Sequence, residues 1–305
     1  MLKIWLAAGA AMLMCACTPQ QSATMEADAP SAAGGEHPAL FVVRDDDSTM
    51  YLYGTVHVRP QGSPWGGPNA EAALAESEEV WTEIEISPRA DAQAQALVLE
   101  HGVAPADRPL SSWLTEDENA RLNALVANLG VPPAMIESMK PWLASLTLSV
   151  LPIVQAGYDP NAGVDRAIDA AAEAQGKTMR ALETVEEQIG FLSGFSEEIQ
   201  HAMLIDAIDN AEQGAELIDG MSQAWERGDM QTLEALVVDQ TRADYPELYQ
   251  VIFVDRNNAW METLTAELEG SGVDFVAVGA GHLIGEDGLV EQMRARGYTV
   301  ERVAE

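Results

Sequence analysis

Two Gly-x-x-His tetrapeptides near the two ends of the chain are the residues best suited to chemistry. Gly54–His57 follows the strand-like run Met50–Tyr53, and Gly279–His282 follows the strand-like run Phe275–Val278. Glycine at a strand end lets the backbone turn sharply, so the imidazole three residues later can point into the mouth of a sheet. Two imidazoles brought together by folding would form half of a metal site or an acid/base pair.

A third strand could supply the acid. Val80–Ile86 alternates with period two, which places Glu83 and Glu85 on one face with Trp81. That face either meets water at a sheet edge or projects one glutamate toward His57. Two histidines and one carboxylate form a common hydrolytic metal set that leaves a position open for water. Without a metal, the same groups could act as a general base pair.

Arg256 and Glu183 are the other polar residues that could join such a site. Arg256 lies in a helical stretch, either at the surface or reaching inward to clamp a carboxylate or an oxyanion. Glu183 follows a short strand, where it could bind a ligand or orient one, and Thr184 suits a helix N-cap. The remaining three histidines lack partner motifs and are interpreted as structural or exposed: His37, His101 and His201.

Composition excludes several classes of protein. The chain has 305 residues, of which 47% are hydrophobic, so it can bury a full core. Its formal net charge is −33, which argues against nucleic-acid binding and against docking on anionic lipid. Phosphate loops, His-Glu-x-x-His motifs and Gly-x-Ser-x-Gly elbows are absent from the sequence.

The N-terminus is interpreted as a targeting segment. Residues 1–16 form a short basic and apolar signal peptide, and Ala16 before Cys17 resembles a bacterial lipobox, so Cys17 is the expected lipidation site. A plain secretory signal is the alternative. Residues 17–37 read as a flexible tether. We therefore expect an outer-membrane lipoprotein facing the periplasm, or a soluble periplasmic protein, which touches the membrane only through its anchor.

The pattern of elements predicts one domain over 38–305. Strands cluster at both ends of the chain, with a helical insert over about 88–270. The fold class is therefore α/β (mixed α+β), with a central mixed sheet built from N- and C-terminal segments and the insert packed as a cap. The expected strands are 40–43, 50–53, 80–86, 178–182, 274–278 and 298–303, and the expected helices include 69–77, 115–129, 165–174 and 288–296.

In this order, several short motifs resemble the TraB/PrgY/GumN family, which is related to the Tiki metalloproteases. The motifs are Leu52–His57, Trp81–Glu85, Lys140–Leu143, Leu182–Gln188, Ala224–Asp229, Arg256–Trp260 and Val278–Leu283. The resemblance spans about residues 40–303. It implies a fold similar to erythromycin esterases and to haem-binding ChaN-like proteins.

The resemblance also implies a site and an activity. It assigns His57, Glu83 and His282 as ligands of a divalent metal (manganese, cobalt or zinc), with Arg256 as a polar partner in a catalytic set of His57, Glu83, Arg256 and His282. The expected function is hydrolysis of a peptide or small-molecule substrate. The alternative is a non-catalytic envelope protein that binds peptide, haem or metal in the same cleft.

Overall fold

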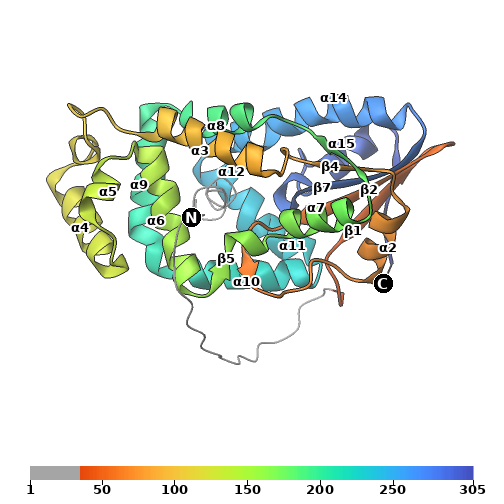
Figure 1. Cartoon of the computed structure of the whole chain (residues 1–305), viewed down its shortest axis with the longest axis horizontal. Coiled ribbons are helices and arrows are strands. Elements are labelled where there is room, and N and C mark those ends of the chain that lie inside the picture. Colours follow the sequence, from red (N-terminus) through yellow and green to blue (C-terminus); the bar gives the residue numbers. More distant parts are fainter. Residues whose placement is uncertain (1–34, 305) are drawn as a thin grey trace.

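The computed structural model describes residues 35–304, so the predicted signal peptide, Cys17 and most of the tether lie outside the described residues. A six-stranded sheet forms one half of the molecule, and a layer of helices forms the other (Figure 1). This arrangement confirms the predicted mixed α/β class. The strands are β1 (Leu40–Arg44), β2 (Ser48–Thr55), β4 (Glu79–Thr82), β6 (Thr178–Ala181), β7 (Gly272–Gly279) and β8 (Thr299–Arg302).

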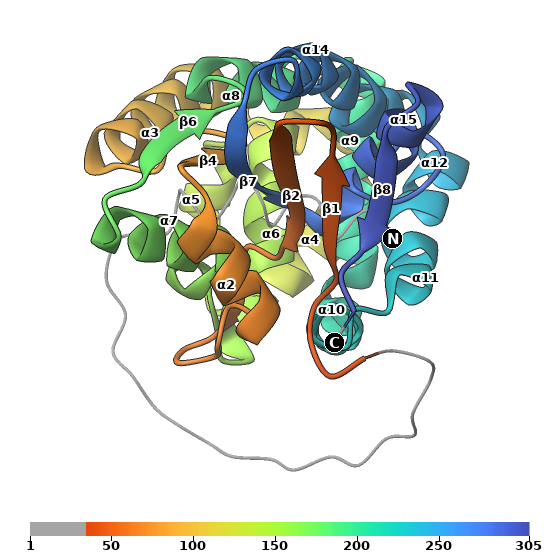
Figure 2. The same cartoon turned by 90° about the vertical axis from the view of Figure 1, so that its right-hand side faces the viewer.

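The strand order in the sheet is β6-β4-β7-β2-β1-β8, which is visible from left to right in Figure 2. β2, β7, β4 and β6 run parallel, whereas β1 is antiparallel to both of its neighbours. The expected strands 40–43 and 50–53 are present in β1 and β2, which form a hairpin, and Asp45 closes it by accepting hydrogen bonds from the backbone N–H groups of Asp47 and Ser48. The sheet therefore joins segments from both ends of the chain.

Two expectations about the sheet are wrong in detail. The third strand ends at Thr82 rather than Ile86, because the Thr82 hydroxyl donates to the carbonyl oxygen of Ile84 and the chain turns there. Glu83 is consequently buried while Glu85 is exposed, so the two do not share a strand face. In addition, β6 lies inside the predicted helical insert yet pairs with β4, so the sheet is not built from the terminal segments alone.

Helices cover both faces of the sheet. α14 (Arg256–Leu268) lies on one side, and α2 (Pro68–Glu76) and α7 (Val164–Ala174) lie on the other (Figure 2). α15 (Leu289–Ala295) packs beside β8. These helices match the predicted ones to within a few residues.

The helical half faces the carboxyl ends of the parallel strands (Figure 1). Its elements include α3 (Pro88–Gly102), α4 (Glu116–Leu129), α5 (Pro133–Glu137), α6 (Pro141–Gln155), α8 (Val185–Ser193), α9 (Glu197–Asn210) and α10 (Gly214–Glu226). α4 begins with a capping box, in which Thr115 and Glu118 bond reciprocally. A second, smaller apolar core holds α4, α5, α6 and α9 together, separate from the core around the sheet.

From α10 the chain continues through short segments to α14. These are α11 (Met230–Leu233), the π-helical η4 (Glu234–Asp239), α12 (Gln240–Asp244), α13 (Pro246–Tyr249) and the π-helical η5 (Gln250–Asp255). The remaining strands, β3 (Arg59–Pro60) and β5 (Tyr158–Asp159), form a separate two-stranded pair.

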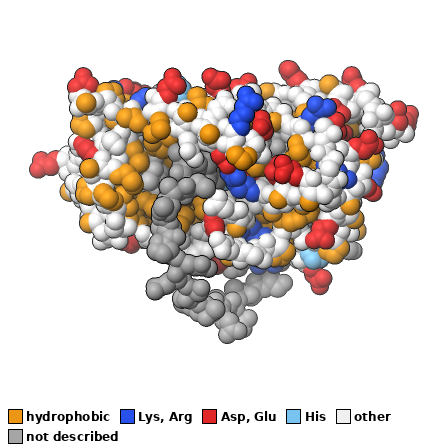
Figure 3. Space-filling model, viewed as in Figure 1, with side chains coloured by type: hydrophobic (Ala, Val, Ile, Leu, Met, Phe, Trp, Pro, Cys, Tyr) orange, Lys and Arg blue, Asp and Glu red, His pale blue; other side chains and the backbone are white. Residues whose placement is uncertain are grey.

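The surface is acidic, as composition requires. Asp and Glu side chains are spread over the face drawn in Figure 3, and apolar side chains gather toward its helical end. The large exposed hydrophobic residues lie in the helical half: Leu99, Val103 and Met135. Within residues 35–304, the structure contains no helix of the length and apolarity that crossing a bilayer demands.

Candidate active site

Four parallel strands deliver polar side chains to one edge of the sheet. Glu183 follows β6, Glu83 follows β4, His282 follows β7 and His57 follows β2. The carboxyl ends of parallel strands are where open α/β sheets bind ligands. The structure thus brings together the four residues that the sequence placed at strand ends.

The two Gly-x-x-His segments are neighbours in register. β2 pairs with β7 so that Gly54 lies opposite Val278 and Thr55 lies opposite Gly279. Neither Gly54 nor Gly279 has a positive φ, so the predicted sharp turn does not explain why glycine occupies these two positions. Close packing is the reason: a Cβ on Gly54 would lie 2.9 Å from the Cα of Ala280.

Gly279 forms the floor on which the site converges. A Cβ placed there would lie 3.1 Å from Glu83 Oε1 and 3.5 Å from both His57 Nε2 and His282 Cδ2. The backbone N–H of Gly279 also donates to Glu83 Oε1 at 2.7 Å. Glycine therefore leaves room for three functional side chains at one point.

Arg256 is the buried centre of the charge arrangement. Its Nη2 donates to Glu83 Oε2 and to Glu183 Oε1, each at 2.6 Å, and its Nε donates to Glu183 Oε2 at 3.0 Å. Trp260 and Gln188 complete the shell of Glu183 by donating to its two oxygens. The predicted inward reach of Arg256 is thus present, and its partners are carboxylates of this chain.

These contacts set the ionisation of the two glutamates in opposite directions. Burial alone would raise the pKa of Glu83, but the charge of Arg256, with help from the two histidines, lowers it to about 2. Burial raises the pKa of Glu183, and Arg256 only partly offsets that effect. Glu83 is accordingly the carboxylate that stays charged in the site.

His282 is fully buried, and both of its ring nitrogens are engaged. Its Nδ1 lies 2.7 Å from Asn257 Oδ1, an acceptor, so Nδ1 carries the proton. Its Nε2 lies 3.1 Å from Arg256 Nη1, a donor, so Nε2 accepts. Burial and the neighbouring Arg256 hold the pKa of His282 well below its usual value, which keeps the imidazole neutral.

His57 has a different environment. Its side chain is 20% exposed, and its Nδ1 lies 3.3 Å from Asp165 Oδ1, at the N-terminal end of α7. Burial acts to lower the pKa of His57, but the charge of the neighbouring Asp165 outweighs this and raises it. The sequence analysis missed Asp165, and the acidic first turn of its helix was the only signal available.

The predicted metal ligands do not form a free ligand set in this arrangement. Both nitrogens of His282 are engaged and Glu83 is bonded by Arg256 and Gly279, whereas His57 Nε2 faces the site. A guanidinium already holds the position beside Glu83 and His282 that a divalent ion would take. Metal binding by these three residues stays a prediction, and it would require Arg256 to move.

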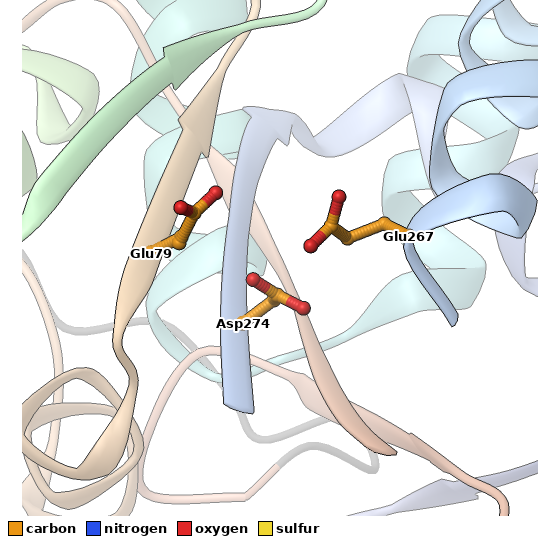
Figure 4. A group of neighbouring side chains, drawn as sticks. All are labelled: Glu79, Glu267 and Asp274. Atoms are coloured by element: carbon orange, nitrogen blue, oxygen red, sulfur yellow. The ribbon is translucent and has the colours of Figure 1, made fainter. Parts of the chain in front are cut away.

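A separate acidic group lies at the opposite edge of the sheet. It is formed by Glu79, Glu267 and Asp274, which bring three carboxylate oxygens within 4.8 Å of one another (Figure 4). Among residues 35–304, no other three His, Cys, Asp or Glu side chains bring possible metal-ligand atoms this close together. Glu79 begins β4 and lies opposite Asp274 of β7. This group is remote from the histidines, because it sits where the parallel strands start.

The other residues singled out from sequence lie outside this cluster. Thr184 is the N-cap of α8, as predicted, with a capping box to Glu187. His201 lies 3.4 Å from Glu118, and His101 ends α3. His37 packs against Gly67. None of these three histidines approaches the edge that carries His57.

Comparison with known proteins gives a family but no close relative. No curated protein and no solved structure matches the chain. The sequence profile of the TraB/PrgY/gumN family matches residues 39–302, which is nearly the whole described domain and includes both Gly-x-x-His segments. The chain therefore belongs to the TraB/PrgY/gumN family.

Proposed function

We propose that this protein is a hydrolase in which His57 acts as the general base on a water molecule that attacks an ester or amide. The observation that carries the proposal is the pairing of His57 Nδ1 with Asp165 at 3.3 Å, at the mouth of a pocket that Glu83 also lines. A histidine held by a carboxylate on one nitrogen presents the other nitrogen to a substrate or a water.

Asp165 gives His57 its tautomer and its basicity. A proton on Nδ1 directed at Asp165 leaves Nε2 free to accept the proton of the attacking water. The charge of Asp165 then stabilises the imidazolium that forms, which agrees with the raised pKa of His57. The proton returns from Nε2 to the leaving oxygen or nitrogen as the tetrahedral intermediate collapses.

Arg256 and His282 hold the neighbouring groups in place without touching the substrate. Arg256 fixes Glu83 in its charged form beside His57, while His282 is neutral, fully buried and bonded at both nitrogens. We assign these two residues a positioning role, and no step of the proposed hydrolysis passes through a metal. The activity is proposed for the periplasmic face of the outer membrane, because the sequence predicts export and lipidation at Cys17.

The test is hydrolysis of a panel of chromogenic esters and peptide amides by the purified full chain. His57→Gln should lower kcat by about 10²- to 10⁴-fold, and Asp165→Asn should lower it with little change in KM. His201→Gln, which also removes an imidazole beside a glutamate, is the matched control and should leave kcat unchanged.

Elemental mass spectrometry of the same samples separates the metal-free reaction from the metal-dependent one. Activity that survives exhaustive chelation supports the proposal. Activity that requires bound manganese, cobalt or zinc, together with loss of that metal from His57→Gln, favours the predicted metal site. A chain that hydrolyses nothing, and a His57→Gln variant as active as wild type, would each contradict a general-base role for His57.

A further inference from the structure

The pocket in front of His57 has a distinctive set of walls. It is open to solvent, its cavity volume is about 30 Å³, and it lies between β2, the loop after β4, and the first turns of α3 and α7. Four carboxylates line it, from Glu83, Glu85, Asp91 and Asp165, and the basic side chains in its wall are His57 and Arg166. Ile84 and Ile86 give it an apolar side.

Several hydrogen-bond donors of this pocket are already engaged. Arg166 Nη2 donates to Asp91 Oδ1 at 2.9 Å, so its charge is paired. Gln188 Nε2 donates to Glu183 and more weakly to Glu83. The Thr82 hydroxyl donates to the carbonyl oxygen of Ile84 at 2.8 Å. A ligand that requires donors from the wall would have to displace these bonds.

Acceptors, in contrast, remain available. Thr55 is only 2% exposed, although it lies in the pocket wall. Its hydroxyl has no hydrogen-bond partner within residues 35–304. A buried hydroxyl without a partner costs stability, so its retention here points to a ligand. Glu85 is exposed at the rim, and its Oε1 accepts a hydrogen bond from the Ser87 hydroxyl.

We propose that this pocket binds a protonated amine of the substrate through acceptors of its wall that include the Thr55 hydroxyl and the Glu85 carboxylate. An ammonium group offers three donors and no acceptor, which complements a wall with four carboxylates and a hydroxyl that can accept. The carboxylate excess of the wall and the net charge of −33 both attract a cation to the mouth. The inference rests on the proposed function for its placement beside the scissile bond, but amine binding itself needs no turnover.

The experiment compares benzylamine, benzyl alcohol and benzoate as probes of the purified full chain by isothermal titration calorimetry. The three share an aromatic ring that suits Ile84 and Ile86 and differ in charge. We expect benzylamine to bind at least about tenfold more tightly than benzyl alcohol, with benzoate weakest. Equal affinities, or tighter binding of benzoate, would overturn the proposal.

Variants locate the site. Thr55→Val keeps the side-chain shape and should weaken benzylamine binding about three- to tenfold without lowering the unfolding temperature, because it removes an unpaired hydroxyl. Glu85→Gln should weaken it about two- to fivefold, less at high salt. Asp46→Asn removes the same charge at the far end of β2 and should change nothing.

The outcomes separate this inference from the proposed hydrolysis. If benzylamine binds and no ester or amide is cleaved, the pocket stands and the hydrolase fails. If esters are cleaved but Thr55→Val leaves benzylamine affinity unchanged, or Asp46→Asn lowers it as much as Glu85→Gln does, the amine site fails alone. A lowered unfolding temperature of Thr55→Val would show a structural partner for the hydroxyl and would also count against the site.

Discussion

Two buried carboxylates at opposite edges of the same sheet, Glu83 and Asp274, have pKa values that are shifted in opposite directions. At the carboxyl edge, Arg256 bonds both Glu83 and Glu183, and the pKa of Glu83 falls to about 2. At the other edge, burial and the neighbouring Glu267 raise the pKa of Asp274 to about 6. β4 and β7 contribute to both groups, so the strands do not decide the direction of the pKa shift. At Glu83 the buried cation lowers the pKa, whereas at Glu183 burial outweighs the same cation.

The protein keeps a buried carboxylate charged at the carboxyl edge of the sheet. There the guanidinium of Arg256 offsets the free-energy cost of burying the charge of Glu83. The opposite edge has Arg180 paired with Glu79 at its rim, and the charge of Asp274 is disfavoured. Variants that remove the cation from one edge, or the acid from the other, test the comparison directly.

Arg256→Met should have the largest effect. It leaves Glu83 and Glu183 buried without their partner, and breaking a buried pair in this way typically costs about 3–5 kcal/mol of unfolding free energy. The variant should also lose hydrolysis, because Glu83 then neutralises beside His57. Urea unfolding monitored by tryptophan fluorescence measures the first effect.

Arg180→Met is its control at the opposite edge. Arg180 pairs with Glu79 but is half exposed, so we expect a loss no greater than about 1 kcal/mol. Equal losses for Arg256→Met and Arg180→Met would erase the distinction between the edges.

Much of the carboxyl edge was predictable because its signals are local. His57, His282 and Glu183 each follow an expected strand, Glu83 lies toward the end of another, and parallel strands end together. The capping boxes at Thr115 and Thr184 are equally local, and both are present. These features depend on neighbours in the sequence, which a single chain displays.

The pairings inside the site were not predictable, because they join residues far apart along the chain. Asp165 reaches His57 only once α7 packs against β4 and β7, and nothing near either residue in the sequence marks the other. Arg256 and Asn257 both contact His282, and they directly follow the π-helical turn η5, whose wider register the apolar periodicity does not reveal. The two Gly-x-x-His segments look alike in sequence, so this difference between His57 and His282 is not visible there.

Substitutions at the two strand-end glycines compare a contact with backbone to a contact with a movable side chain. Gly54→Ala would place a Cβ 2.9 Å from backbone of Ala280, which cannot move easily, so we expect a loss of about 1–3 kcal/mol. Gly279→Ala meets Glu83 Oε1 at 3.1 Å, a side-chain atom that can shift. It should cost less stability than Gly54→Ala but lower kcat, because it displaces the carboxylate beside His57. The reverse order of stabilities would contradict this explanation of the glycines.

Asp274→Asn should have a smaller effect, with the opposite sign. The folded-state pKa of Asp274, about 6, lies above the value of about 3.9 expected when unfolded. Its contribution to stability is therefore present below about pH 4 and lost as the pH rises through 6. Asn, which carries no charge, should unfold at higher urea concentration than wild type above pH 7, by about 1–2 kcal/mol after allowing for solvent screening.

The pH profile of that variant distinguishes charge from packing. Wild type and Asp274→Asn should converge near pH 4, where Asp274 is protonated in the folded state, and diverge above pH 6. Glu83 behaves in the opposite sense, because its lowered pKa means that its contribution is lost as the pH falls below about 4.3 toward 2. A variant less stable than wild type at pH 7 would show that the carboxylate of Asp274 is stabilised there, and the two edges would then differ in geometry alone.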